Sequence, residues 1–298
     1  MDEPGFPNVE AGWAAKLLVA RWWRKLVPAL LVRTAWRPVS ALLVRVPAVR
    51  TMCERHLRIV LTGTDREGDV HGLAPAYLYE VGLRYDMFWR DRVFERAHVE
   101  NSRRIEEALE HKAGVLLVTL HMTIPSGLVA ALKSEHGGCS TAVSPEAYQP
   151  VTNGLTGYEC VRARRIVQRY GRGVNATGSY AVFEHELRVG GVVALTFDVP
   201  GRTPTPMLGR TMMLASGTSR LALATGATVL PVRPVRRGSR LVFEVLPPVD
   251  LQETTLEEAQ SRIARALEPV MLAAPELSDR PAYRWAPASD QTPLHSSD

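Results

Sequence analysis

The sequence has few cysteines, and none is placed to build a cross-linked or metal-bound fold. Cys53, Cys139 and Cys160 are odd in number, widely spaced and not part of a Cys-x-x-Cys pair. This pattern argues against a disulfide framework and against the common spacings of zinc ligands. We therefore expect no metal site and a reducing compartment.

Long hydrophobic runs are also missing, although the first fifty residues are rich in apolar stretches. Lysines and arginines interrupt these stretches, so that no run approaches the roughly 18 uncharged residues that a membrane span needs. Because these charges do not precede one clean apolar core, a signal peptide is not expected. We expect Pro28, Pro38 and Pro47 to divide the segment into short helices.

Tryptophan, a residue type that settles at the headgroup level of membranes, is frequent in this segment. It occurs at Trp13, Trp22, Trp23 and Trp36. We interpret residues 1–60 as an amphipathic helical segment that docks on an anionic membrane surface, peripherally on the cytoplasmic face of the inner membrane. The alternative is that these helices pack on the protein core and leave their arginines in solvent.

A strong charge of one sign is absent as well. Lys and Arg number 36 against 31 Asp and Glu, giving a net charge of +5. This small excess favours anionic partners such as phospholipid headgroups or an acidic acyl carrier protein. The basic residues are dispersed and no aromatic-rich strand pair accompanies them, so nothing indicates a nucleic-acid-binding module.

The chain does have enough apolar sequence for a large core: 46% of its 298 residues are hydrophobic. After residue 60, short β-rich runs alternate with helical patterns, which predicts an α/β fold with a mostly parallel or mixed sheet flanked by helices. Predicted strands cover residues 115–120, 140–144, 192–197, 229–235 and 241–246. Predicted helices cover residues 99–112, 125–133, 157–170, 180–189, 218–225 and 256–272. We assign residues 61–286 to this domain and expect the polar tail, 287–298, to be disordered.

His121 stands where a buried strand turns into a helix, a place where α/β enzymes position reactive side chains. The preceding residues 115–120 read VLLVTL, and a helical pattern starts at Pro125. A histidine satisfied by a backbone carbonyl at a strand end is the structural alternative.

Four passages together resemble the bacterial lipid A acyltransferases and the related mannoside acyltransferases of the lysophospholipid acyltransferase superfamily. They are residues 114–121 (GVLLVTLH), 190–210 with Asp198 and its glycine-containing loop, 215–232 ending in Pro231-Val232, and 281–285 (PAYRW). The Phe-Pro-Glu-Gly motif of the glycerol-3-phosphate branch is absent. The resemblance implies transfer of a fatty acyl group from coenzyme A or acyl carrier protein to a lipid or glycolipid hydroxyl or amine, without a metal or redox cofactor.

In that family four residues separate the histidine from an acid, but this chain has Ser126 at the acid's position. A serine can hydrogen-bond to the imidazole, yet it cannot compensate the positive charge of a protonated ring. Three interpretations stay open: another acid replaces it, the reaction is slow, or the protein binds without catalysing. No other histidine has an acid at this spacing.

Two acids are candidates for the replacement because each follows a predicted strand, and the carboxyl ends of parallel strands meet at one edge of the sheet. Glu146 follows the next strand in the chain and is the first candidate; the mannoside branch has a functional glutamate in a comparable place. Asp198 is the second. The alternatives are a surface or helix-start carboxylate for Glu146 and a turn-forming aspartate for Asp198.

Four arginines are candidates for binding phosphate on the donor or on a lipid headgroup. Arg164 and Arg165 fall on one predicted helix, whereas Arg202 and Arg210 bracket the loop after Asp198. The alternative for such residues is a solvated helix or loop surface.

We therefore predict an acyltransferase with His121 as general base. The alternatives are a catalytically silent homologue that binds lipid or acyl carrier, and a thioesterase or hydrolase that uses water. The sequence has no Gly-x-Ser-x-Gly elbow, which argues against the usual serine hydrolases.

Overall fold

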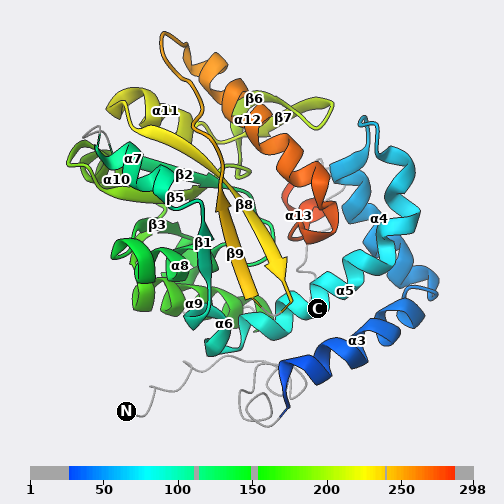
Figure 1. Ribbon diagram of the computed structural model, residues 1–298. Helices are drawn as coiled ribbons and strands as arrows, with labels where there is room; N and C mark the ends of the chain where they lie inside the picture. Colours follow the sequence, from blue (N-terminus) through cyan, green and yellow to red (C-terminus); the bar gives the residue numbers. More distant parts are fainter. Residues whose placement is uncertain (1–26, 111–113, 149–153, 239, 286–298) are drawn as a thin grey trace.

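A computed structural model describes residues 27–110, 114–148, 154–238 and 240–285 (Figure 1). Its helices are α3 (Ala29–Leu43), α4 (Pro47–Leu61), η1 (Glu67–Asp69), α5 (Val70–Phe88), α6 (Asp91–Glu95), α7 (Arg103–Glu110), α8 (Ser126–His136), η2 (Pro145–Tyr148), α9 (Gly154–Tyr170), α10 (Tyr180–Arg188), α11 (Gly217–Thr225), α12 (Leu256–Ala273), η3 (Pro275–Leu277) and α13 (Pro281–Trp285). Trp13, Trp22, Trp23 and the predicted tail 287–298 lie outside the described residues.

The strands are β1 (His98–Glu100), β2 (Val115–Thr119), β3 (Ser140–Val143), β4 (Arg172–Asn175), β5 (Val192–Thr196), β6 (Pro200–Met207), β7 (Arg210–Leu214), β8 (Thr228–Arg237) and β9 (Arg240–Val245). Seven of them form one sheet in the order β1-β9-β8-β2-β5-β3-β4. All neighbours in it are parallel except β8 and β9, which form an antiparallel hairpin. The predicted α/β class with a mostly parallel, mixed sheet is confirmed.

The central strand β2 is apolar from Val115 to Val118 because both of its faces are covered. Leu116 and Val118 point into a core shared with α4, α5, α10, α11 and α12. Val115 and Leu117 point into the opposite core, which α6, α7, α8 and α9 cover. Successive side chains of a strand alternate between faces, so this one run supplies both cores.

Two predicted segments differ from the structure for local reasons. The predicted helix 99–112 starts only at Arg103, because Asn101 adopts a left-handed φ of 59° that separates it from β1. The loop expected after Asp198 is instead the antiparallel pair β6 and β7. Leu208 and Gly209, both at positive φ, form the two-residue turn between these strands.

The prediction that Pro38 divides the N-terminal segment is wrong. Pro38 lies inside α3, which continues to Leu43. Packing against α5 holds the helix together: the Trp36 indole donates a hydrogen bond to the Tyr79 carbonyl at 3.1 Å, and Val44 is buried in the core. Tertiary contacts therefore outweigh the loss of one helical hydrogen bond at the proline. Across the described parts of the chain, every helix is too short or too polar to span a membrane.

Candidate functional site

His121 and Asp198 occupy matching places at one edge of the sheet. β2 and β5 are parallel neighbours with Thr119 opposite Thr196, and each of the two residues lies two positions beyond its strand. The carboxyl ends of parallel strands face the same way, so this register brings both side chains to one point. The Phe197 amide also donates to the Thr119 carbonyl at 2.8 Å, extending the pairing beyond the strands.

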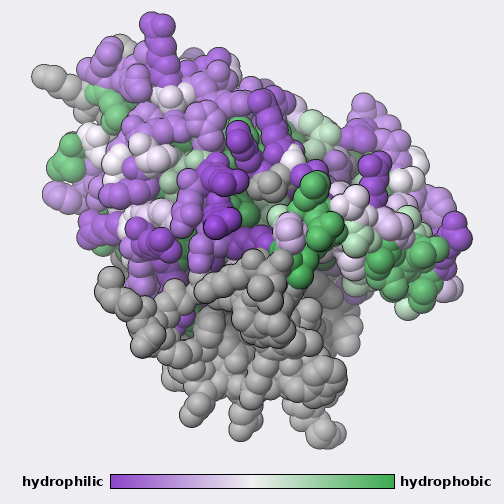
Figure 2. Space-filling view, turned by 60° about the horizontal axis from the view of Figure 1, so that its bottom comes forward, coloured by the Kyte–Doolittle hydropathy of each residue, from purple (hydrophilic) through white to green (hydrophobic). Residues whose placement is uncertain are grey.

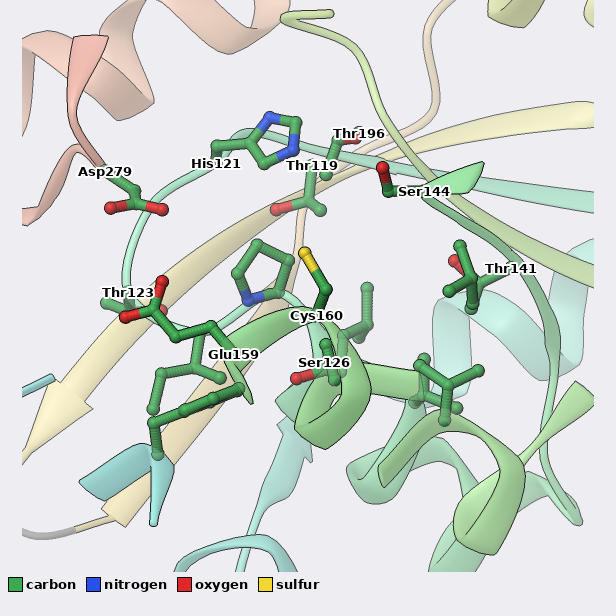
Figure 3. A pocket seen from close by; sticks show the side chains of 18 of the residues that line it. Thr119, His121, Thr123, Ser126, Thr141, Ser144, Glu159, Cys160, Thr196 and Asp279 are labelled. Atoms are coloured by element: carbon green, nitrogen blue, oxygen red, sulfur yellow. The ribbon is translucent and has the colours of Figure 1, made fainter. Parts of the chain in front are cut away.

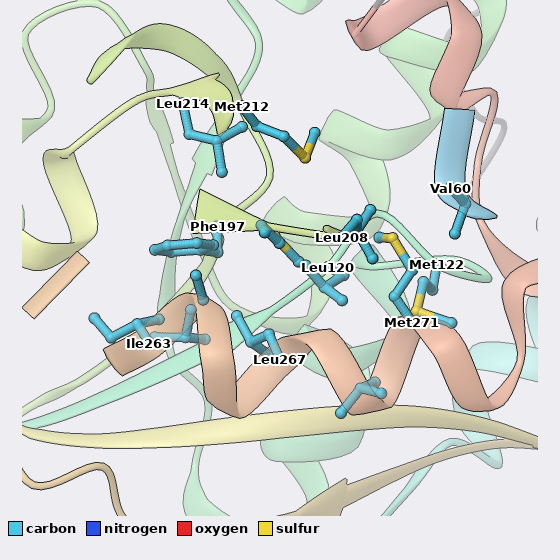
Figure 4. Close-up of a cluster of buried hydrophobic side chains, with 14 of the residues drawn as sticks. Val60, Leu120, Met122, Phe197, Leu208, Met212, Leu214, Ile263, Leu267 and Met271 are labelled. Carbon is cyan, nitrogen blue, oxygen red and sulfur yellow. The ribbon is translucent and has the colours of Figure 1, made fainter. Parts of the chain in front are cut away.

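Apolar side chains that alternate with the two polar ones anchor both loops. Leu120, Met122 and Phe197 are almost fully buried in the core beside α12 (Figure 4). Because neighbouring side chains point to opposite sides of an extended segment, burying these three turns His121 and Asp198 away from the core.

The Asp198 carboxylate binds two groups of His121, the imidazole ring and the backbone N–H. Its Oδ1 atom accepts hydrogen bonds from the ring Nδ1 at 2.7 Å and from the backbone N–H at 2.9 Å. An ionised carboxylate only accepts, so Nδ1 carries the proton and Nε2 is left as the basic nitrogen. The His121 side chain is 30% exposed, whereas that of Asp198 is 0% exposed.

A C-terminal helix completes the surroundings of Asp198. The Arg284 guanidinium donates to Asp198 Oδ2 at 3.0 Å, and the Trp285 indole donates to its backbone carbonyl at 3.1 Å. Burial alone would raise the pKa of Asp198. The His121 charge, the hydrogen bonds from His121 and the Arg284 charge outweigh burial and hold this pKa below its ordinary value.

The chain just before α13 also fixes the histidine loop. The Asp279 amide donates to the His121 carbonyl at 2.7 Å, and the Thr123 amide donates to the Leu277 carbonyl at 2.9 Å. Met122 and Ser278 form an isolated antiparallel bridge. Residues 277–285 therefore bind both members of the pair.

A pocket of about 520 Å³ opens beside His121 (Figure 3). Most of its wall is apolar and comes from α5, α8, α9 and β3; examples are Val81, Phe88, Leu128, Val129, Val143 and Val167. Ser126, the first residue of α8, lies on this wall, as does Cys160 of α9. The arrangement places a basic nitrogen beside a chamber suited to a hydrocarbon chain.

One end of the pocket is charged. Asp279 pairs with Arg84 at 3.0 Å and with Arg280 at 3.2 Å, and Arg280 also pairs with Glu159 at 3.3 Å. Burial would raise the pKa of Asp279, but the three nearby arginines, Arg84 first, hold it well below its ordinary value. Burial raises the pKa of Glu159 in spite of Arg280.

The structure brings together only some of the residues predicted from the sequence. His121 and Ser126 line the pocket, and the buried Asp198 contacts it only through His121. Glu146 lies on η2, and its side chain is outside what the structure describes. No three described His, Cys, Asp or Glu residues are grouped to hold a metal ion.

The four predicted arginines are not among the residues that line the pocket. Arg164 donates to the Ala147 carbonyl at 2.9 Å and lies over the Tyr148 ring. Arg165 lines a separate, smaller hollow, Arg202 is exposed on β6, and Arg210 hydrogen-bonds the Ile59 carbonyl. Phosphate binding by these residues stays a prediction.

Several residues at the site were not singled out by sequence reasoning. Arg84, Glu159, Asp279 and Arg280 have no motif around them, since their pairing depends on contacts between distant segments. Arg284 and Trp285 did carry a signal, because they belong to the PAYRW passage.

Comparison with known proteins agrees with three of the four passages that resemble acyltransferases, and the fourth, residues 281–285, lies outside the matched range. The family model described as bacterial lipid A biosynthesis acyltransferase matches residues 73–277, more than two thirds of the chain. No curated protein gives a significant match. The matched range includes His121, Asp198 and the whole sheet, and it ends just before α13. The resemblance read from the sequence is thereby confirmed, and the chain belongs to the bacterial lipid A biosynthesis acyltransferase family.

Proposed function

We propose that this acyltransferase moves a fatty acyl group from a thioester on coenzyme A or acyl carrier protein to a hydroxyl or amine of a lipid or glycolipid acceptor. The single observation that carries the proposal is the His121–Asp198 pair beside an apolar pocket. His121 is the general base. Asp198 orients His121 and compensates its charge, as the acid of the family motif would; in this chain Ser126 occupies the position of that acid.

The chemistry follows from the free Nε2 of His121. An acceptor hydroxyl is a weak nucleophile, and transferring its proton to Nε2 during attack accelerates the reaction by about 10²–10⁴. The new bond joins the acceptor oxygen to the thioester carbon while the carbonyl electrons move to its oxygen. Collapse reforms the carbonyl and breaks the carbon–sulfur bond, and the proton on His121 leaves with the thiol. The ionised Asp198 stabilises the transient imidazolium.

The pocket suits the acyl chain of the donor. Its apolar wall from α8 and α9 would remove hydrocarbon from water, a favourable transfer of about 0.8 kcal/mol per CH₂ group. His121 stands at the polar part of the same chamber, where the thioester would lie. Ser126 would contact the substrate from the wall instead of orienting the histidine.

We also propose that α3 and the start of α4 form the membrane-docking surface of the protein, on the cytoplasmic face of the membrane. Apolar side chains are exposed along these helices, beside arginines (Figure 2). They are Leu30, Leu31, Val39, Leu42, Leu43, Val46 and Met52. Trp36, by contrast, faces α5. Exposed leucines together with arginines suit the acyl boundary and headgroups of an anionic bilayer.

Acyl transfer can be tested with purified full-length protein. The protein would be mixed with acyl-coenzyme A or acyl carrier protein donors and with vesicles of extracted bacterial membrane lipids. Free thiol release and new acylated lipid would both be measured, comparing wild type with His121→Ala. We expect lipid acylation that falls by at least about 10²-fold in the variant.

Two other results would reject this function. Thiol release that yields only free fatty acid would indicate a thioesterase. Equal, negligible transfer by both proteins would favour the silent homologue. Membrane docking has its own test: co-sedimentation with anionic vesicles should weaken in Leu30→Ser/Leu42→Ser, while unchanged binding would exclude α3 as the docking surface.

A further inference from the structure

Thr123 has a backbone conformation that its residue type disfavours. Its φ is 53°, in the left-handed region, and it is a β-branched residue for which such a value is a true outlier. The Leu277 carbonyl and the neighbouring Met122–Ser278 bridge hold this conformation. Strained residues of this kind persist where the surroundings impose them and are concentrated at functional sites.

Among the described residues, the buried Thr123 hydroxyl has no hydrogen-bond partner. The residue is 6% exposed. A buried hydroxyl in that state destabilises the fold, whereas valine has the same shape and lacks the problem. By contrast, the buried Thr205 hydroxyl donates to the Thr203 carbonyl and accepts from Gln260. The Thr205 hydroxyl therefore contributes hydrogen bonds to the folded state, whereas the Thr123 hydroxyl does not, in the part of the chain that the structure describes.

Thr123 lines the pocket two residues after the general base (Figure 3). It lies on the same side of the pocket as Glu159 and Asp279, with Ser126 nearby on the wall. Thr123 and His121 therefore border the same chamber.

The helix that follows Thr123 presents its positive end to the same pocket. α8 has eleven residues, and Ile124, Pro125 and Ser126 at its start all line the pocket. Within the described chain, its N-cap Pro125 makes no capping hydrogen bond and its first turn has no acidic residue. The Gly127 and Leu128 amides already donate to the Ile124 and Pro125 carbonyls at 2.9 and 3.0 Å, so the helix end contributes its partial positive charge and not these two N–H groups. A carboxylate at position 126 would have neutralised this charge.

We propose that Thr123 Oγ–H, supported by the N-terminus of α8, is the hydrogen-bond donor for the thioester carbonyl oxygen as it becomes negatively charged. This inference rests on the proposed acyl transfer. When the acceptor oxygen bonds to the thioester carbon, the carbonyl electron pair moves to oxygen and the hydroxyl of Thr123 stabilises that charge. The pair returns when the carbon–sulfur bond breaks, and no co-reactant beyond donor and acceptor is needed.

The test compares Thr123→Val, which keeps the shape and loses the donor, with Thr123→Ser, which keeps the donor. The control is Thr205→Val, which removes a bonded, buried hydroxyl away from the pocket. Full-length proteins would be assayed for thiol release and lipid acylation with hexadecanoyl-coenzyme A and membrane-lipid vesicles, and their melting temperatures measured.

We expect kcat to fall about 10²-fold in Thr123→Val with KM within about twofold, since the contact strengthens only in the transition state. Its melting temperature should equal or exceed that of wild type, while Thr123→Ser keeps most of kcat. Thr205→Val should show the reverse, a lower melting temperature with an unchanged kcat.

Three results would overturn the inference. Wild-type kcat in Thr123→Val, with His121→Ala inactive, would reject it and leave acyl transfer intact. A parallel fall of melting temperature and kcat in Thr123→Val would assign Thr123 a structural role. Equal turnover by wild type and His121→Ala would reject acyl transfer and this inference together.

Discussion

Two acidic residues beside the His121 loop, Asp198 and Asp279, are both paired with arginine but differ in what else they bind. Asp198 faces Arg284 on one side and the His121 imidazole on the other. Asp279 is enclosed by Arg84 and Arg280, and its link to His121 runs through backbone atoms. An acid whose side chain pairs only with arginines, such as Asp279, fixes the positions of the chain segments that carry them. An acid that shares its charge with an imidazole can also support proton transfer.

The largest contrast is expected between Asp198→Asn and Asp279→Asn. Asp198→Asn removes the charge that orients His121, and we expect turnover to fall by about 10³–10⁴, as in triads that lose their acid. Asp279→Asn should lower turnover far less but lower the free energy of unfolding by about 2 kcal/mol, because Arg84 loses its partner. Turnover and urea denaturation of both variants check this, with Glu146→Gln, the other candidate acid, expected within a few-fold of wild type. A larger loss in Glu146→Gln than in Asp198→Asn would reverse the assignment.

Arg284→Ala should have the next largest effect and should change the pH profile. Without this guanidinium the pKa of Asp198 rises, so loss of activity through protonation of Asp198 starts at a higher pH, and Asp198 Oδ2 loses the contact that positions it; we expect turnover to fall about tenfold. Arg84→Ala removes a charge from Asp279 instead, and the acid limb of its kcat profile should stay near that of wild type. Identical shifts in the two variants would mean that Asp198 does not control the limb.

Ser126→Asp should fail to improve the enzyme. Asp198 already binds Nδ1 of His121, and a new carboxylate would place negative charge at the start of α8 beside the reacting carbonyl. We expect a few-fold decrease of kcat, measured by thiol release. A gain of tenfold or more would mean that the acid missing from the sequence still limits the reaction.

The smallest predicted effect concerns the anchor of α13. His56 is buried, stacks on Tyr77 and accepts a hydrogen bond from the Ala282 amide at 3.2 Å, which requires a neutral ring. Burial first, and Arg55 next, lower its pKa to about 4. The unfolded chain takes up this proton near pH 6.5 but the folded chain does not. Stability should therefore fall by about 1 kcal/mol between pH 7 and 5.5. His56→Gln should remove that part of the pH dependence in thermal melts, and an unaltered slope would contradict it.

Part of the fold and of the site could be predicted from the sequence. β2 and β5 were predictable because each is a short, continuous apolar run, and the edge rule correctly indicated that Asp198 would lie at the edge where His121 lies. The rule alone did not indicate whether Glu146 or Asp198 would lie closer to His121. Chain order favoured Glu146, yet β5 lies between β2 and β3 in the sheet, so Asp198 is on the strand beside His121.

Other parts of the site were beyond sequence patterns for a physical reason. The ion pairs of Arg84 and Asp279 join residues 195 positions apart, and neither lies in a motif. The strain at Thr123 depends on the chain near Leu277, which no local propensity encodes. Conversely, Pro38 is a strong local signal that packing against α5 overrides.

Asp198 holds His121 with a proton on Nδ1 and leaves Nε2 to act as the base. Nitrogen NMR of protein labelled at histidine, with the His121 signals assigned by their loss in His121→Ala, reports directly which ring nitrogen carries the proton. We predict a protonated Nδ1 and a proton-free Nε2 in the neutral ring, with this preference lost in Asp198→Asn. A neutral His121 with its proton on Nε2, unchanged by Asp198→Asn, would exclude this role of Asp198.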